Sequence, residues 1–295
     1  MQNISNCPIC ESNKLKHFIK VKDHSVSKED FILVECESCG FKFTNPRPSV
    51  TEIGKYYQSE DYVSHNDSNK GLINGIYQLV KKYTLLKKLN LVVQISGKKT
   101  GKILDYGCGT GDFIKILHDV KWEVKGLEPD EGARKLAQNK VGEEKITDLS
   151  KLNSLDNDYD IVTCWHVVEH IHELNTSLEK LITALNTKGK LLIAVPNITS
   201  YDSIHYKEFW AALDVPRHLY HFRPLDIENL AKKHGLELER TLPMVFDSFY
   251  VSMLSEKYKA GSIVKAFWIG LISNIKAASK GNNSYSSQIY ILKKI

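Results

Sequence analysis

Residues 102–128 constrain the fold of this chain more than any other stretch. The run 102–106 reads as a short strand and leads directly into the glycine-rich turn 107–111. A helical stretch follows from 112 to about 120, and a second strand, 123–127, ends on Glu128. Glycines tolerate positive φ and carry no side chain, so the backbone can turn sharply there and approach a ligand. An acid at the tip of the second strand can accept hydrogen bonds from ribose hydroxyls. The pattern predicts a β-α-β unit that binds a nucleoside.

The spacing of the glycines, and the acid before them, indicate which nucleoside. Dinucleotide sites use G-x-G-x-x-G, with the pyrophosphate on the helix N-terminus. Here Gly107, Gly109 and Gly111 alternate, and Asp105 precedes them. A carboxylate repels a pyrophosphate but suits the ammonium group of an amino acid. A nucleoside joined to an amino acid, with no phosphate, is S-adenosylmethionine. The alternative is an ordinary nucleotide-binding or ligand-free β-α-β unit.

The sequence LDYGCGTGDF, followed by GLEP, resembles motifs I and II of the class I S-adenosylmethionine-dependent methyltransferases. This resemblance implies an α/β fold: a Rossmann-like, seven-stranded methyltransferase sheet with helices on both faces. It also implies an enzyme that uses S-adenosylmethionine. The cofactor-binding residues expected from the motifs and the strand ends are Asp105, Gly107, Gly109, Gly111, Glu128, Asp148, Leu149 and Trp165.

Two later strand ends extend the expected cofactor site. A third strand near 145–147 ends at Asp148, and in similar methyltransferases an acid here contacts the adenine amino group. A helix or turn cap is the alternative role for Asp148. A fourth strand, 159–164, is a continuous apolar run that is typical of a buried parallel strand. Parallel sheets bind ligands beyond the carboxyl ends of their strands, so we expect Trp165 and His166 near the cofactor.

Four cysteines near the N-terminus form two C-x-x-C pairs, Cys7 with Cys10 and Cys36 with Cys39. Four soft ligands at this spacing are typical of a tetrahedral structural zinc site, with no position left open for water. Strands are expected at 16–21 and 31–35, so residues 1–46 are predicted to form a zinc ribbon. Metal binding can supply folding free energy on the order of 10 kcal/mol to so small a module. A redox role for a C-x-x-C pair is the alternative.

Residues 47–101 are predicted to be a connector and lid helix. A cysteine pair, then N-P-R-P, Y-Y and a further tyrosine resembles methyltransferases in which this segment covers the cofactor. By that resemblance Tyr56, Tyr57 and Tyr62 are lid candidates, and simple packing onto the main domain is the alternative. Apolar residues over 71–95 follow helical spacing, and we expect the lysines of this helix to face water.

Residues 102–295 are predicted to be the methyltransferase domain, with a cap insertion at about 243–285. The insertion holds an apolar helix around 263–275 and is expected to cover the substrate pocket. The last strand, 287–293, is expected at the edge of the sheet if the resemblance holds.

A loop-like stretch at 210–222 is rich in His, Arg, Tyr and Trp. Loops at the carboxyl edge of a sheet carry substrate-facing groups. A base that acts near neutral pH is best supplied by histidine. His218 is our first candidate for the catalytic base and His221 the second; the alternative is that both only anchor the loop. Methyltransferase families that act on the amines of adenine or glutamine commonly carry N-P-P-Y or D-P-P-Y after the fourth strand. The resemblance to methyltransferases without this motif favours oxygen or carbon acceptors over amino groups.

The charge of the chain suggests partners. The formal net charge is +5, with eight lysines and no acid over 70–102, and seven lysines and no acid over 257–295. These stretches could meet a nucleotide-linked substrate, RNA or a membrane surface, or could be solvated helix faces. No apolar run follows Met1, and the longest one, 266–272, is too short to cross a bilayer. We therefore expect a cytoplasmic protein without a transmembrane segment, for which peripheral membrane contact stays open.

One function is predicted and two alternatives are kept. The predicted function is S-adenosylmethionine-dependent methyl transfer to an oxygen or carbon of a small molecule such as a sugar nucleotide, a quinone-like phenol or a secondary metabolite. The first alternative is RNA base methylation, in which the zinc ribbon and the lysine-rich faces bind the phosphates. The second alternative is a non-catalytic binding module on a methyltransferase fold.

Overall fold

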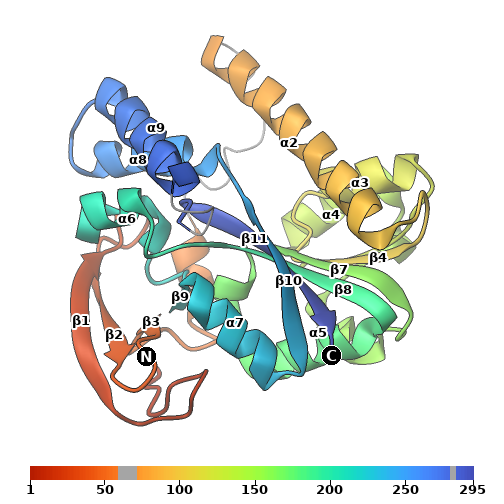
Figure 1. The fold of residues 1–295 in the computed structure, drawn as a ribbon, viewed down its shortest axis with the longest axis horizontal. Coiled ribbons are helices and arrows are strands. Elements are labelled where there is room, and N and C mark those ends of the chain that lie inside the picture. The colour runs from red at the N-terminus through yellow and green to blue at the C-terminus, as the bar shows by residue number, and fades with distance from the viewer. Residues whose placement is uncertain (59–71, 280–283) are drawn as a thin grey trace. The chain divides into compact units, whose positions relative to one another are not determined.

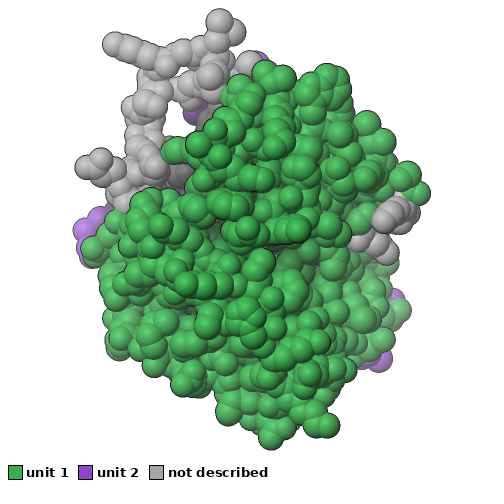
Figure 2. All heavy atoms as spheres, turned by 90° about the vertical axis from the view of Figure 1, so that its left-hand side faces the viewer, with its two compact units in different colours: residues 1–64, 168–175, 194–290 green, residues 65–167, 176–193, 291–295 purple. Residues whose placement is uncertain are grey.

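The computed structural model describes residues 1–58, 72–279 and 284–295. The chain divides into two compact units, coloured separately in Figure 2. Unit 1 contains residues 1–64, 168–175 and 194–290, and unit 2 contains residues 65–167, 176–193 and 291–295. The lid candidate Tyr62 lies outside the described residues.

Unit 1 begins with a small antiparallel sheet. Its strands are β1 (Leu15–Lys22), β2 (Asp30–Cys36), β3 (Lys42–Thr44) and β9 (Tyr220–His221), in the order β1-β2-β3-β9 (Figure 1). The two strands expected in the N-terminal module are therefore confirmed. The stretch 210–222, however, is not wholly a loop, because Tyr220 pairs with Phe43 and His221 pairs with Lys42. A two-residue strand is too short to leave a periodic signal, which is why the sequence did not show it.

The rest of unit 1 is largely helical. Its α-helices are α6 (Tyr201–Tyr206), α7 (Pro224–Lys233), α8 (Asp247–Tyr258) and α9 (Ile263–Ser279). Its short 3₁₀ helices are η1 (Ile53–Tyr57), η4 (Val168–His170), η5 (Lys207–Phe209) and η6 (Ala211–Leu213). Trp210 and Tyr206 are the largest buried side chains of its core, which also takes in Phe31 and Leu33 from β2. The core thus ties the stretch 201–215 to the N-terminal sheet.

Unit 2 contains the predicted β-α-β unit. β4 (Lys102–Tyr106), α3 (Asp112–Asp119) and β5 (Glu123–Leu127) follow one another as expected. β4 pairs in parallel with β5 and with β7 (Tyr159–Trp165), and β5 pairs in parallel with β6 (Ile146–Thr147). The remaining elements are α2 (Leu72–Ser96), α4 (Glu131–Val141), η2 (Glu143–Lys145) and η3 (Leu149–Ser154). Parallel pairing brings the carboxyl ends of β4, β5 and β7 to one edge, where the predicted cofactor residues stand.

One seven-stranded sheet has the order β10-β11-β8-β7-β4-β5-β6. It includes β8 (Leu185–Pro196), which follows α5 (Leu174–Ala184), together with β10 (Leu236–Pro243) and β11 (Ser287–Lys294). The seven strands confirm the predicted α/β fold. The expected edge position of the last strand is wrong, because β11 lies between β8 and β10. The first six residues of β11 are all buried, whereas most of β10 is partly exposed, so β10 is the strand that tolerates the edge.

Helix α2 confirms the helix expected over 71–95. Its residues Lys82 and Lys87 are exposed as expected, but the expectation is wrong for Lys81 and Lys88. Lys81 forms an ion pair with Asp112, with 2.7 Å between Nζ and Oδ2. The Nζ of Lys88 lies 4.0 Å from the ring centroid of Trp165. Both lysines share a helical stripe with the buried Val92 and Ile95, and this spacing is the sequence signal that they face protein rather than water.

Helices α8 and α9 occupy the insertion expected at about 243–285. They pack against each other so closely that a Cβ added at Gly270 would lie 2.9 Å from the Phe249 ring. In the described part of the chain, no helix combines the length and the apolarity needed to span a membrane.

Candidate functional site

The glycine turn between β4 and α3 has a left-handed backbone at three positions. The φ angles are +74° at Gly107, +55° at Gly109 and +80° at Gly111. A Cβ at Gly107 would lie 2.5 Å from Val167, and one at Gly111 would lie 2.7 Å from Ala137. A Cβ at Gly109 would meet nothing within 4 Å. Gly107 and Gly111 are therefore required for packing, whereas Gly109 borders open space that a ligand can enter.

Glu128 is held against this turn at the end of β5. Its Oε2 accepts a hydrogen bond from the Gly109 backbone N–H at 2.7 Å, and its Oε1 accepts one from the Asp130 N–H at 2.9 Å. Burial raises the pKa of Glu128 above its usual value, and the two backbone hydrogen bonds oppose that rise. The carboxylate is thus fixed beside the open space at Gly109, with lone pairs left for ligand hydroxyls.

Asp105, two residues before the turn, is almost fully buried with 2% of its surface exposed. It accepts a hydrogen bond from the Thr163 hydroxyl at 2.6 Å. Burial raises the pKa of Asp105 to about 7, although the Thr163 hydrogen bond and the positive charge of Lys88 act to lower it. A cationic ligand group near this carboxyl would restore its ionised form.

Trp165, at the end of β7, has contacts on its ring. Phe113 approaches it edge-on, with 5.5 Å between ring centroids, and Lys88 lies over it. The Trp165 Nε1 is buried, and no residue in the described ranges accepts its hydrogen bond. The next residue, His166, has a φ of +56°, an unusual value for a non-glycine residue and one that often occurs at functional sites. Lys88 is the member of this group that the sequence analysis missed.

Asp148 has the capping role that the sequence left open. Its carboxylate accepts a hydrogen bond from the Ser150 N–H at 2.8 Å and so caps η3, of which Leu149 is the first residue. Arg134 donates to it at 3.4 Å. The contact of Asp148 with adenine stays a prediction.

These residues of unit 2 fit S-adenosylmethionine. The buried carboxyl of Asp105 suits its ammonium group, and the fixed carboxylate of Glu128 suits its ribose hydroxyls. The absence of a side chain at Gly109 leaves space that the cofactor can occupy. The buried Trp165 Nε1–H is available to donate a hydrogen bond to a bound ligand.

His218, in unit 1, is held in one tautomer. Its Nδ1 lies 2.8 Å from the backbone oxygen of Ala212. A carbonyl oxygen can only accept, so Nδ1 carries the proton and the neutral ring keeps its lone pair on Nε2. That Nε2 lies 4.0 Å from the Asp214 carboxylate, which would stabilise a protonated ring.

His170 lies beside His218. The ring centroids are 4.6 Å apart with the rings nearly perpendicular. The His170 Nδ1 lies 3.0 Å from the Arg217 carbonyl oxygen and 3.0 Å from the Tyr57 hydroxyl. Burial, together with the nearby His218, lowers the pKa of His170 to about 4. Glu169, His170 and His218 each offer a ligand atom within 4.8 Å of the others, so their lone pairs together suit a proton or a metal ion.

His221 has a different environment. Its Nε2 lies 3.2 Å from Thr44 Oγ1, and that hydroxyl donates its own proton to the His218 carbonyl at 2.8 Å. The His221 Nε2 must therefore donate to Thr44. Burial holds the pKa of His221 well below its usual value. The second base candidate is thus a buried residue of the β3–β9 pair.

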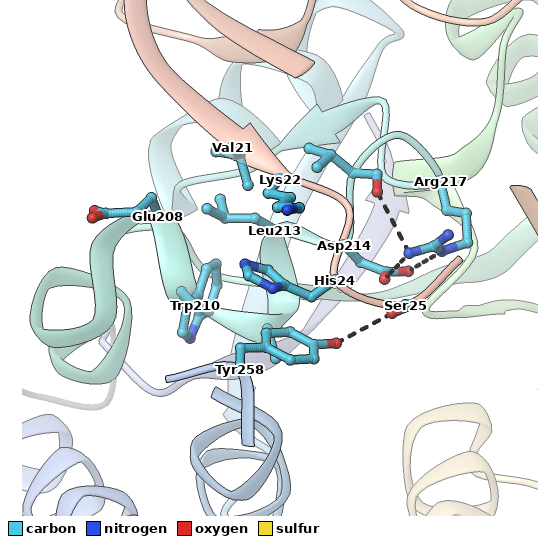
Figure 3. Close-up of a pocket in the computed structure, with 12 residues that line it drawn as sticks. Val21, Lys22, His24, Ser25, Glu208, Trp210, Leu213, Asp214, Arg217 and Tyr258 are labelled. Carbon is cyan, nitrogen blue, oxygen red and sulfur yellow. Dashed lines mark hydrogen bonds and ion pairs between the residues drawn. The ribbon is translucent and has the colours of Figure 1, made fainter. Parts of the chain in front are cut away.

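An ion-pair network fixes the segment that carries His218. The Arg217 Nη2 lies 2.7 Å from the Asp214 carboxylate (Figure 3). It also lies 3.0 Å from Asp23, and Arg217 donates a hydrogen bond to the Tyr56 carbonyl. The adjoining pocket is lined by residues that include His24 and Tyr258, and its cavity volume is only about 10 Å³. That is about the room of one water molecule, so the pocket is a poor candidate for the acceptor site.

The four N-terminal cysteines come together in unit 1. The Sγ atoms of Cys7 and Cys39 are 3.6 Å apart, those of Cys10 and Cys36 are 3.5 Å apart, and all four lie within 4.8 Å of one another. A tetrahedral zinc site with bonds of about 2.3 Å has sulfur–sulfur distances of about 3.8 Å. The cluster fits such a metal, and the Arg223 guanidinium anchors it by donating to the Cys39 carbonyl at 2.6 Å.

The chain was compared with known proteins. A family model described as a methyltransferase domain matches residues 78–241. A probable S-adenosylmethionine-dependent methyltransferase of Mycolicibacterium smegmatis is 27% identical over 169 residues, which cover 56% of this chain and 62% of that protein. A mitochondrial ubiquinone biosynthesis O-methyltransferase of Rattus norvegicus is 27% identical over 165 residues, which cover 50% of this chain and 48% of that protein. The matches thus span only about half to three fifths of these relatives.

Among solved structures, the fold is similar to that of magnesium protoporphyrin IX methyltransferase from Synechocystis PCC 6803 with bound S-adenosylhomocysteine. The TM-score is 0.53 at 17% identity, and the match covers 82% of this chain and 98% of the other. At this identity the likeness concerns the fold alone.

Proposed function

Since this chain belongs to the methyltransferase domain family, we propose that it transfers the methyl group of S-adenosylmethionine to an oxygen or carbon of a small-molecule acceptor. The observation that carries this proposal is the turn at Gly109, which opens onto free space beside the fixed carboxylate of Glu128. The buried Asp105 supplies the second contact that this cofactor requires.

The residues of unit 2 hold and orient the cofactor. When bound, S-adenosylmethionine supplies a methyl group that its positively charged sulfur makes electrophilic. Glu128 accepts hydrogen bonds from the ribose hydroxyls, and Asp105 pairs with the ammonium group. The main contribution of the protein is then positioning, which can lower a barrier by about 7–11 kcal/mol.

We assign the role of base to His218. The hydrogen bond from Nδ1–H to the Ala212 carbonyl fixes the ring. Nε2 takes the proton from the methyl-accepting molecule, and Asp214 stabilises the charged ring that results. Such a base contributes a factor of about 10² to 10⁴. His221 is less suited, because its Nε2 already donates to Thr44 and burial disfavours its protonation.

The four cysteines supply a structural role in this proposal. Zinc bound by Cys7, Cys10, Cys36 and Cys39 would have four thiolate ligands and no open position, so it would stabilise the N-terminal module without entering the chemistry.

An oxygen acceptor of the quinone-like phenol class is favoured among small molecules. The support is the similarity to ubiquinone biosynthesis O-methyltransferases, which covers half of this chain. A sugar nucleotide remains the second class to test, since the lysine-rich stretches suit a phosphate-bearing acceptor.

The test is methyl-labelled S-adenosylmethionine incubated with the zinc-loaded protein and, separately, with phenols, sugar nucleotides or total RNA. The proposal predicts label transfer to a small molecule at moderate salt. Transfer of the label to RNA alone, with a rate that falls steeply as the salt concentration rises, would instead establish an RNA methyltransferase. Binding of S-adenosylhomocysteine without transfer to any of the three would leave cofactor binding intact and remove the proposed acceptor classes.

A further inference from the structure

Helices α8 and α9 turn their small residues inward and their bulky apolar residues outward. The buried face of α8 includes Ser248, Ser252 and Ser255, and Ser248 donates to the Gly270 carbonyl at 3.1 Å. The buried face of α9 includes Ala266, Gly270, Ser273 and Ala277. Small residues let two helices approach closely, as they do in bilayers, where the outer surface need not be polar.

The outward face is apolar in a regular pattern. On α9 the exposed residues Val264, Phe267, Trp268 and Ile275 follow the i, i+3, i+4, i+11 spacing of one helical stripe. The exposed residues Phe246, which precedes α8, and Tyr250 and Met253 on α8 follow the i, i+4, i+7 spacing of one helical stripe. We call these seven residues the α8–α9 face. Phe267 and Trp268 are 54% and 55% exposed, which is unusual for the two bulkiest residues of an amphipathic helix.

The charge around this face is mainly positive. Lys257, Lys259, Lys265 and Lys276 are all exposed, and no acid occurs from residue 257 to the end of the sequence. Lys276 lies 3.7 Å from the ring centroid of Tyr201 and Lys259 lies 5.5 Å from that of Phe209, contacts that leave the charge of each lysine in place. The acids of α8 are Asp247, half-buried at its first position, and Glu256, which is buried and lies 3.3 Å from Lys265.

We propose that the α8–α9 face docks on the surface of an anionic lipid bilayer. Aromatic and aliphatic residues flanked by lysines are the composition of helices that lie in the plane of a membrane interface. A second copy of this chain is a poorer occupant, because a two-fold contact would bring each lysine-bordered face against itself. The proposal is independent of methyl transfer.

The experiment measures co-sedimentation of the zinc-loaded protein with vesicles. Vesicles of phosphatidylglycerol and phosphatidylcholine are compared with vesicles of phosphatidylcholine alone. The wild type should bind the anionic vesicles, bind the neutral ones far more weakly, and lose binding as salt screens the lysines. The double variant Phe267→Ser, Trp268→Ser should bind roughly tenfold or more weakly, since it removes the two largest inserting side chains.

Controls separate docking from folding and from self-association. Leu225→Ser alters an apolar side chain that is 51% exposed on α7, outside this face, and should leave vesicle binding unchanged. The thermal midpoint of each variant shows that it is folded. Lys257→Gln combined with Lys259→Gln should weaken binding to anionic vesicles only. Equal binding of the wild type to both vesicle types, or unchanged binding of the double variant, would overturn the proposal. So would sedimentation as a dimer that the double variant abolishes, without vesicle binding.

Discussion

At the scale of single residues, the proposed function depends on Asp105 and His218. Asp105 and His218 were predicted from sequence as cofactor contact and base, and each has a surrounding that no sequence pattern shows. The Thr163 hydroxyl that contacts Asp105 comes from the neighbouring strand, and the Ala212 carbonyl that fixes His218 lies six residues away through a 3₁₀ turn. Asp105 was chosen because it precedes the glycine turn, and His218 because histidine suits a base near neutral pH; both roles stay predictions. The partners of these residues could not be predicted, because partners depend on strand pairing and on turns without periodicity.

Asp105 predicts a pH dependence of cofactor binding. Its pKa of about 7 means that the free protein holds the carboxyl largely protonated at lower pH. The ligand's ammonium favours the ionised form, so affinity for S-adenosylhomocysteine should rise with pH below about 7, by up to roughly tenfold per unit, and level off above. Calorimetry across this range measures it. Asp105→Asn should bind more weakly with no such slope, and an unchanged slope in that variant would refute the assignment.

The two histidines predict opposite outcomes on substitution. His218→Asn keeps a donor near the Nδ1 position but removes the Nε2 base, so kcat should fall by about 10² to 10⁴ with little change in thermal midpoint. His221→Gln keeps a donor near the Nε2 position and should retain most activity. His221→Ala should lower the free energy of unfolding by about 1–3 kcal/mol, because Thr44 Oγ1 loses a buried partner. Comparable losses of kcat in His218→Asn and His221→Gln would remove the distinction between base and anchor.

At the scale of elements, strong local signals were predictable and short or non-local ones were not. The bounds of β4 and β5 are those expected, because glycine flanks β4 on both sides and an acid follows β5. β9 was missed because its two residues gain their structure only from β3. The position of β11 within the sheet was also missed, since strand order is set by packing and not by the pattern of the strand itself.

The glycine turn predicts a separation of binding from stability. Gly109→Ala places a methyl group in open space, at the modest cost of a left-handed backbone of about 1–2 kcal/mol, and should weaken S-adenosylhomocysteine binding. Gly111→Ala meets the same backbone cost and also forces a Cβ to within 2.8 Å of the Ala137 backbone, so it should unfold at a clearly lower temperature. Thermal melts with and without ligand distinguish the two. A Gly109→Ala variant with wild-type affinity would show that the ligand does not enter this space.

The cysteine cluster predicts dependence of the N-terminal module on metal. Elemental analysis should find one zinc per chain. Cys10→Ser removes one of the four thiolates, so the protein should lose the metal and its thermal midpoint should fall. Because Cys10 is exposed, the substitution creates no cavity. Cys108→Ala, outside the cluster, should keep the zinc. A metal-free wild type with an undiminished midpoint would contradict a structural role.

At the scale of the whole molecule, the α/β class and the seven strands were implied by the resemblance of residues 102–128 to methyltransferase motifs, and the cysteine cluster was predicted from the spacing of its two pairs. The proposed division at residues 46 and 101, with a cap at about 243–285, remains a prediction about function. Compactness groups the chain differently, since residues 194–290 fall into the same unit as the N-terminal sheet. This grouping depends on contacts between segments that are distant in the sequence. One example is the ion pair of Arg217 with Asp23, which no sequence pattern predicts.

The most direct test of the central claim is calorimetric titration of the folded, zinc-loaded protein with S-adenosylhomocysteine. The account predicts one site per chain with micromolar affinity, weakened in both Asp105→Asn and Gly109→Ala. A folded protein that releases no heat and shows no thermal shift with this ligand would contradict a methyltransferase function.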